Sequence, residues 1–282
     1  MAKILEGKLV VSALNERLRE DVDQLKAKGI SPALAIVRVG ERPDEISYER
    51  AAARRSETIG VKVKKFTLPA DAAQDELLAV IDEINGDKGI HGCLMLRPLP
   101  AHMDDNLVRN SLSPAKDIDG ITDDSLAGVF TGTTTGFPPC TAQACIEILN
   151  HFGIDPAGKR AVVVGRSLVI GKPVAMMLDQ RNATVTVCHS RTSDAPAICR
   201  EADIIVVAIG RAGFIGKESL RPGQFVIDVG INVDEKGKLC GDVNFAEAEA
   251  IVAGITPVPG GVGTVTTSVL VKHVVAAAKA AQ

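Results

Sequence analysis

Short apolar runs rich in β-branched residues alternate with helical patterns along most of this chain. In the second half, the segments that read as strands cover residues 161–164, 182–188, 202–210 and 224–230, and helical segments separate at least the first three. Runs of this kind are typical of strands that are buried on both faces of a parallel sheet. The pattern therefore predicts an α/β fold with a doubly wound, Rossmann-like parallel sheet in this half.

The first half shows the same alternation, so we expect a second α/β domain there. The segments that read as helices are 10–28, 45–58 and 74–84, and those that read as strands are 32–40, 61–68 and 91–96. The helix at 45–58 carries Tyr48, the single tyrosine of the chain. A Gly/Thr-rich run at 128–136 has no periodicity and marks the expected domain boundary, with a helix at 141–151 bridging the domains.

A glycine turn follows the apolar run at 161–164. Gly165, Arg166 and Ser167 form the turn, and Gly171 precedes an apolar helical pattern. Strand, glycine turn and helix in this order aim free N–H groups at a phosphate. The match to the G-x-G-x-x-G motif is imperfect, because Ser167 occupies the position of the second glycine and the last glycine, Gly171, comes one residue late. An ordinary turn that binds nothing is therefore the alternative.

The end of the next strand indicates which cofactor binds. NAD sites usually have an acid about 20 residues past the glycines, where it holds the ribose 2′-hydroxyl. Here the strand ends in His189, Ser190 and Arg191, with no acid before Asp194. A hydroxyl and a guanidinium would bind a 2′-phosphate, and Arg166 could add a bidentate contact. We expect NADP; the alternative is that these arginines are solvated loop residues.

Composition excludes several classes of protein. The 282 residues are 46% apolar, enough for two cores, and the net charge of −3 argues against a nucleic-acid partner. The N-terminus has no signal-peptide pattern and no apolar run reaches about 18 residues, so we expect a cytoplasmic protein without a membrane partner. The six cysteines show no C-x-x-C spacing, which favours buried thiols over disulfides or a metal site.

Residues 255–263 read I-T-P-V-P-G-G-V-G, a composition that predicts a rigid loop instead of a regular element. Glycines that adopt positive φ would let the backbone approach a ligand closely. A purely structural crossover is the alternative. The apolar segment at 265–278 is expected to begin as a strand or turn and to end as a helix packed on the first domain.

Five features together resemble the methylenetetrahydrofolate dehydrogenase/methenyltetrahydrofolate cyclohydrolase family, in order and over essentially the whole chain. They are Tyr48, K-D-I-D-G at 116–120, P-P-C-T at 138–141, V-V-V-G-R-S at 162–167 and T-P-V-P-G-G-V-G at 256–263. The resemblance implies a homodimer whose subunits hold the tetrahydrofolate substrate between two domains. It implies a folate-binding catalytic domain of residues 1–139 plus 268–282 and an NADP-binding Rossmann domain of residues 140–267.

The resemblance also implies an activity: hydride transfer from 5,10-methylenetetrahydrofolate to NADP, followed in bifunctional members by hydrolysis to 10-formyltetrahydrofolate. Matched residue by residue, Asp119 is the folate-binding acid and Tyr48 the aromatic wall, and both are assigned as catalytic. The loop residues that line the folate site are Pro259, Gly260 and Gly261. The cofactor-binding residues are Gly165, Arg166, Ser167, Ser190, Ile231 and Thr266.

Two departures from the family concern its cyclohydrolase step. Ala52 stands where the family has a catalytic lysine, and Leu96 stands where it has that lysine's glutamine partner. We therefore expect an NADP-dependent dehydrogenase with weak or absent cyclohydrolase activity, and a separate cyclohydrolase that acts downstream. One alternative is a fully bifunctional enzyme in which Arg55 or Arg97 acts for the lysine. The other is a non-catalytic protein that binds NADP or folate.

Overall fold

The computed structural model describes residues 1–281, and the chain divides into two compact units. The nucleotide unit contains Met1–Ser12 and Thr141–Thr266, and the catalytic unit contains Ala13–Cys140 and the chain from Thr267 onward. The first twelve residues thus group with the nucleotide unit, which differs from the expected 1–139 domain. The reason is β1 (Lys3–Ile4), which pairs in parallel with β11 (Gly254–Ile255). Two residues are too few for periodicity to reveal a strand.

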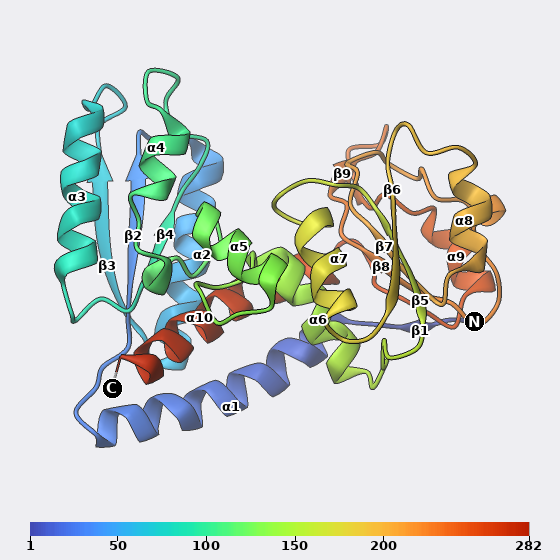
Figure 1. Ribbon diagram of the computed structural model, residues 1–282, viewed down its shortest axis with the longest axis horizontal. Helices are drawn as coiled ribbons and strands as arrows, with labels where there is room; N and C mark the ends of the chain where they lie inside the picture. The colour runs from blue at the N-terminus through green and yellow to red at the C-terminus, as the bar shows by residue number, and fades with distance from the viewer. Residues whose placement is uncertain (282) are drawn as a thin grey trace. The chain divides into compact units, whose positions relative to one another are not determined.

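The nucleotide unit is built on a six-stranded sheet in the order β1-β11-β8-β7-β5-β6, and all its pairings are parallel. α7 covers one face, and α8 and α9 cover the other (Figure 1). Buried Val, Ile and Cys side chains of the strands pack with α8 and α9 in one hydrophobic cluster. The longer strands are β5 (Arg160–Val164), β7 (Ile204–Val207), β8 (Phe225–Asp228) and the edge strand β6 (Thr184–Cys188), and the helices are α6 (Cys140–His151), α7 (Gly171–Asp179), α8 (Ala195–Glu201) and α9 (Phe245–Ile251).

The catalytic unit contains a parallel three-stranded sheet in the order β3-β2-β4. Figure 1 shows α3 on one side of this sheet and α2 on the other. The strands are β2 (Ala33–Val39), β3 (Lys62–Leu68) and β4 (Gly92–Met95). The helices are α2 (Pro43–Ile59), α3 (Gln74–Gly86), α4 (Asp105–Asn110), the 3₁₀ turn η1 (Pro114–Lys116) and α5 (Asp123–Thr131), together with most of α1 (Gly7–Ala27) and α10 (Val262–Ala280).

The predicted strands and most predicted helices are confirmed within a few residues, but two segments differ. α5 extends into the Gly/Thr-rich run, and the division between units falls after Cys140 instead of within 128–136. A Cβ at Gly128 would lie 2.1 Å from the carbonyl oxygen of Thr135, so this glycine permits close packing of the run. α10 is helical from Val262, so the strand or turn expected at 265 is absent there.

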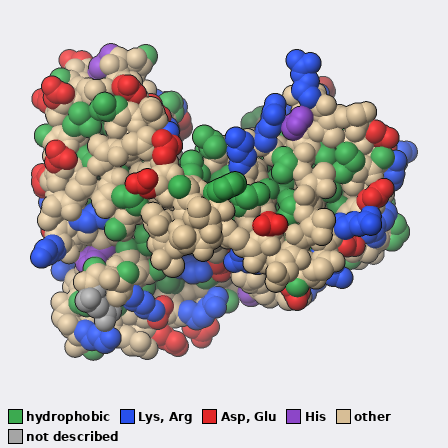
Figure 2. Space-filling view, in the orientation of Figure 1, with side chains coloured by type: hydrophobic (Ala, Val, Ile, Leu, Met, Phe, Trp, Pro, Cys, Tyr) green, Lys and Arg blue, Asp and Glu red, His purple; other side chains and the backbone are tan. Residues whose placement is uncertain are grey.

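Surface charges of both signs are interspersed on the face shown in Figure 2. None of the helices in residues 1–281 is long and apolar enough to cross a membrane. The described residues also contain no cluster of His, Cys, Asp or Glu that could hold a metal ion. All six cysteines are free thiols, five of them buried.

Candidate active site

In the catalytic unit, the loop that carries Asp119 is shaped by a second acid, Asp117. Its fully buried carboxylate accepts hydrogen bonds from the backbone N–H groups of Ile121 (3.0 Å) and Thr122 (2.8 Å) and from the hydroxyl of Ser125 (2.6 Å). These bonds close the turn around residues 118–120. Asp117 was not among the predicted site residues, although it belongs to the K-D-I-D-G motif.

Contacts from distant parts of the chain fix the same loop. The carbonyl oxygen of Ile118 lies 2.8 Å from Nδ1 of His273 and accepts a hydrogen bond from the thiol of Cys140 at 3.2 Å. Gly120 has φ +66°, and a Cβ there would lie 2.5 Å from the backbone nitrogen of Pro139. The loop therefore packs directly against the P-P-C-T segment, and only glycine is compatible with that contact.

Tyr48, Asp119 and Cys140 interact electrostatically within this unit. Burial raises the pKa of Asp119 to about 6; the charge of Asp117 raises it further, while the Cys140 side chain and the charge of Arg97 oppose the rise. Burial, and then the charge of Asp119, also raise the pKa of Tyr48 well above its usual value. Near neutral pH the cluster thus presents one ionised carboxylate beside a neutral phenol and a neutral thiol.

The two departures from the family pattern are both buried apolar side chains. Ala52 is fully buried on α2, and Leu96, which follows β4, is 5% exposed. Arg97 was a candidate replacement for the lysine, but its guanidinium forms a bidentate ion pair with Asp105. Neither Ala52 nor Leu96 can carry a proton, and the guanidinium of Arg97 cannot accept one.

In the nucleotide unit, the glycine turn after β5 is a close backbone crossing. Gly165 has φ +125°, and a Cβ there would lie 2.3 Å from the carbonyl oxygen of Ala208. A Cβ at Gly171 would meet the carbonyl oxygen of Gly165 at the same distance. The hydroxyl of Ser167 accepts a hydrogen bond from the backbone N–H of Ile170, and Arg166 is exposed. The turn is therefore closely packed at its two glycines and exposes Arg166 and Ser167 just before α7, where the free N–H groups of a helix N-terminus can bind a phosphate.

The loop after β6 holds the predicted contacts to the 2′-phosphate. The backbone N–H of His189 bonds to the hydroxyl of Thr192 at 2.8 Å, and that of Arg191 bonds to Nδ1 of His189 at 3.1 Å. Ser190 and Arg191 are exposed, and the next acid, Asp194, caps α8 through the backbone N–H of Ala197. The acid nearest to this strand end is thus engaged in a helix cap.

Two buried acids that the sequence patterns did not single out organise the remaining strand ends. Asp242 accepts bonds from the backbone N–H groups that follow β7, at Ile209 (2.7 Å), Gly210 (3.0 Å) and Arg211 (2.8 Å). Asp228 accepts three backbone bonds of 3.0 Å, among them one from Gly230. Burial raises the pKa of Asp228 to about 6, although these hydrogen bonds act to lower it. Only the three-dimensional fold brings these acids beside the loops they hold.

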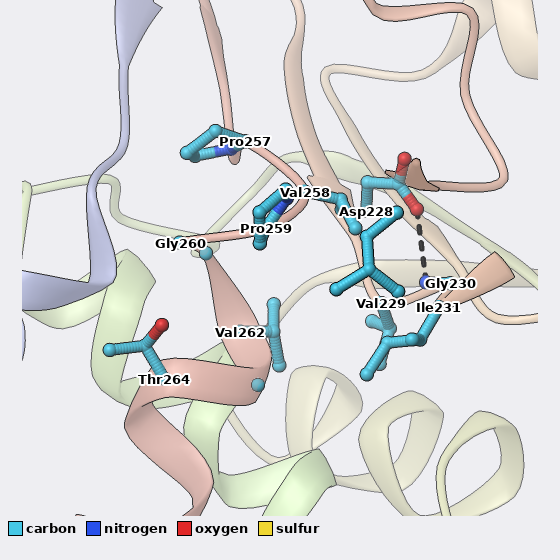
Figure 3. A pocket seen from close by; sticks show the side chains of 13 residues that line it. Asp228, Val229, Gly230, Ile231, Pro257, Val258, Pro259, Gly260, Val262 and Thr264 are labelled. Carbon is cyan, nitrogen blue, oxygen red and sulfur yellow. Dashed lines mark hydrogen bonds between the residues drawn. The ribbon is translucent and has the colours of Figure 1, made fainter. Parts of the chain in front are cut away.

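The Pro/Gly loop lines a hollow of about 210 Å³ together with the end of β8 (Figure 3). The predicted residues Pro259, Gly260, Gly261 and Ile231 all line it, and the side chain of Ile231 is 66% exposed. Thr266 is not among the lining residues, and its hydroxyl bonds to the carbonyl oxygen of Val262 at 3.3 Å.

The structure thus brings the predicted loop residues together with Ile231, within the nucleotide unit. Tyr48 and Asp119 belong to the catalytic unit. A folate site formed by Tyr48 and Asp119 together with the loop residues Pro259, Gly260 and Gly261 remains a prediction.

Both halves of the chain match domains of one known protein family. Residues 5–119 match the catalytic domain of tetrahydrofolate dehydrogenase/cyclohydrolase, and residues 139–282 match its NAD(P)-binding domain. A bifunctional protein FolD of Carboxydothermus hydrogenoformans is 52% identical over 279 residues, which are 98% of this chain and 97% of that protein.

Solved structures give the same result. The bifunctional FolD of Campylobacter jejuni has a TM-score of 0.96 and 38% identity, with 99% of each chain covered. A Trypanosoma brucei FolD complexed with NADP cofactor and inhibitor has a TM-score of 0.90 and 35% identity, and the match covers 99% of this chain and 98% of that one. These matches confirm the predicted α/β fold and the nicotinamide-nucleotide domain. This chain belongs to the tetrahydrofolate dehydrogenase/cyclohydrolase family.

Proposed function

We propose that this protein oxidises 5,10-methylenetetrahydrofolate to the 5,10-methenyl cation with NADP as the hydride acceptor. The observation that carries the proposal is the cluster of Tyr48, Asp119 and Cys140, in a chain whose other half matches an NAD(P)-binding domain and has a tight glycine turn after β5. Bound NADP supplies the site that accepts the hydride. The chain's own residues bind and align the folate, because hydride transfer is chiefly a matter of positioning.

Asp119 and Tyr48 are the proposed folate contacts in the catalytic unit. A pterin presents two N–H groups along one edge, and an ionised carboxylate can accept both. Such donors stabilise the ionised form of Asp119, whose pKa is raised to about 6 in their absence. The ring of Tyr48 would stack on the pterin plane. Pro259, Gly260 and Gly261 are the proposed folate-lining residues of the other unit.

Arg166 and Ser190 are the proposed contacts to the 2′-phosphate of NADP, with Arg191 beside them. All three are exposed, as a site for a soluble nucleotide requires, and no acid lies at this strand end before Asp194. The Trypanosoma brucei neighbour was solved with NADP, which supports the same cofactor here. Gly165 and Ser167 would cradle the pyrophosphate, and Ile231 and Thr266 would lie beside the nicotinamide half.

The second activity of the family, hydrolysis of the methenyl cation to 10-formyltetrahydrofolate, is the second candidate function. Similar proteins carry the name bifunctional protein FolD at 45–52% identity over nearly their whole length. These names support the fully bifunctional alternative better than the weak cyclohydrolase expected from Ala52 and Leu96. Hydrolysis in this chain would then need a proton acceptor other than residue 52 or Arg97.

One assay separates these possibilities: NADPH formation and methenyl absorbance are followed together during turnover. A bifunctional enzyme forms NADPH without lasting methenyl accumulation, a dehydrogenase alone accumulates methenyltetrahydrofolate, and a non-catalytic binder forms neither product. The Ala52→Lys, Leu96→Gln double variant is the comparison. If the wild type lacks an acid–base group, this variant should gain about 10²- to 10⁴-fold in hydrolysis; an already bifunctional wild type should gain little.

We also propose that the protein is a cytoplasmic homodimer that works without a nucleic-acid or membrane partner. The net charge of −3 and the family resemblance support this. A separate downstream cyclohydrolase is needed only if the assay shows methenyl accumulation. Light scattering of the purified protein tests the dimer directly.

A further inference from the structure

Glu45 is a buried acid on α2 with one carboxylate oxygen left without a donor. Only 5% of its side chain is exposed. Its Oε1 lies 3.7 Å from Arg42, but the closer partner of that guanidinium is Asp44, at 2.6 Å. Within the described chain, Oε2 is buried and has no hydrogen-bond partner. Burying a carboxylate oxygen in this way is unfavourable unless something else supplies the donor or the positive charge.

The position of Glu45 on the helix connects it with the candidate folate site. Glu45, Tyr48 and Ala52 are spaced i, i+3, i+7, so they lie along one face of α2. The other buried acid of the helix, Glu49, is fully paired, because its two oxygens lie 2.8 Å from Arg38 and from Lys65. Among the described residues of this face, Glu45 is the acid that has an oxygen available for a group that is not part of the chain; the hydroxyl of Ser56, further along the face, is also without a partner but carries no charge.

The helix N-terminus does not explain this arrangement. Acids in a first helical turn interact favourably with the helix dipole, and both Asp44 and Glu45 are placed there. Asp44 gains that benefit while exposed to water. The dipole therefore accounts for an acid at this position but not for a carboxylate oxygen that is buried without a donor.

We propose that Glu45 lies against the one-carbon bridge of the bound folate and stabilises the positive charge that hydride loss creates there. This rests on the proposed dehydrogenase function. One C–H bond of the bridge breaks, both its electrons leave with the hydrogen to the nicotinamide, and the folate keeps a positive charge shared by the bridge carbon and its two nitrogens. A carboxylate favours this cation over the neutral substrate.

The other side chains near Glu45 do not oppose its attraction for the folate cation. Ala52 and Leu96 are apolar and carry no charge, and the guanidinium of Arg97 is paired with Asp105. On the face of α2 that carries Tyr48, the carboxylate of Glu45 is thus compensated only by the distant, shared guanidinium of Arg42, and its Oε2 has no partner among the described residues. Such a site should bind a cationic folate more tightly than a neutral one of the same shape.

The test compares two ligands that differ in charge. Binding of methenyltetrahydrofolate, which is cationic, and of tetrahydrofolate, which is neutral at the same nitrogens, is measured in the wild type, in Glu45→Gln and in Glu57→Gln. Glu57 is an exposed acid on the same helix and serves as the matched control. The chain has one tyrosine and no tryptophan, so the fluorescence of Tyr48 reports binding within seconds of mixing, before hydrolysis interferes.

We expect Glu45→Gln to weaken methenyltetrahydrofolate binding about tenfold or more and to leave tetrahydrofolate binding unchanged. Glu57→Gln should change neither. An equal loss for both ligands would assign Glu45 a packing role, and unchanged binding of both would place it away from the bridge; either result overturns the proposal. If Glu45→Gln does not fold, Glu45→Asp is tested by the same ratio of affinities.

Failure of the proposed function can be recognised separately. A wild-type protein that forms no NADPH from methylenetetrahydrofolate refutes the dehydrogenase, whereas the binding ratio still decides the role of Glu45. An active wild type whose binding ratio does not change in Glu45→Gln refutes only the role of this residue.

Discussion

The catalytic unit and the nucleotide unit build their candidate sites by different means. The catalytic unit relies on side chains whose ionisation is shifted by burial, as at Asp119 and Tyr48. The nucleotide unit relies on backbone: glycines at close crossings, and loops held by the buried acids Asp228 and Asp242. Its predicted contact residues Arg166 and Ser190 lie exposed in the glycine turn after β5 and in the loop after β6.

This difference has a practical consequence for mutation. In the nucleotide unit the damaging changes should be those that add atoms to the tight glycine turn, whereas removal of a surface side chain should cost little stability. In the catalytic unit the damaging changes should be those that alter charge at constant shape.

Gly165→Ala is expected to destabilise the nucleotide unit by about 3 kcal/mol or more, because it adds both a backbone clash and an unfavourable φ. The matched control is Gly158→Ala, which has φ +69° but nothing within 4 Å of the added Cβ. That control should cost about 1 kcal/mol. Urea unfolding of both variants measures the difference. Similar losses would show that the contact with Ala208 does not constrain the turn.

Asp119→Asn keeps the shape of the side chain and removes its charge. Hydrogen bonds to a charged group contribute about 1.5–3 kcal/mol, so folate binding should weaken about 10- to 100-fold. NADP binding should not change, because Asp119 lies in the other unit. Asp124→Asn, an exposed acid on α5, is the control. Equal losses for folate and NADP would indicate misfolding instead of a lost contact.

The activity should also depend on the ionisation of Asp119. Its pKa of about 6 in the free protein means that the carboxylate is present above this pH and is protonated below it. Since folate needs the ionised acceptor, kcat/KM should fall about tenfold per pH unit as the pH drops below about 6. The profile of kcat should fall at a lower pH, because bound folate stabilises the carboxylate. Asp119→Asn should remove this limb of the profile; an unchanged limb would assign it to another group.

Sequence patterns predicted the nucleotide unit well because its inner strands β5, β7 and β8 contain continuous apolar runs, which pair in register as Val164 does with Val207. They did not predict that the first residues join this unit, because β1 depends on a partner strand about 250 residues away. They also missed the helical start of α10 at Val262, since glycine and proline dominate the residues before it. Local patterns report local structure, and these features are set by distant contacts.

The same limit applies to the candidate site. Tyr48 and Asp119 could be predicted from their motifs, whereas Glu45 has an ordinary helical position and becomes notable only when its burial is known. His273 lies 155 residues from the carbonyl group that it contacts at Ile118, so no spacing rule would pair them. Cys140 did carry a signal, the P-P-C-T motif, although its sequence context favoured no more than a buried thiol.

The smallest expected effect concerns cofactor preference, because the relevant side chains are exposed and water can replace part of their contribution. Arg166→Ala should lower the ratio of kcat/KM for NADP over NAD about tenfold, the loss of one charge-assisted hydrogen bond at the 2′-phosphate. Stability should not change, in contrast to Gly165→Ala one residue earlier. Arg160→Ala is the control, since Arg160 is an exposed arginine of the same unit that pairs with Glu201 at 3.0 Å. The ratio is measured from initial rates with each cofactor. If Arg166→Ala and Arg191→Ala both leave it unchanged, the loop after β6 and the glycine turn do not select NADP, and the preference must arise elsewhere in the nucleotide unit.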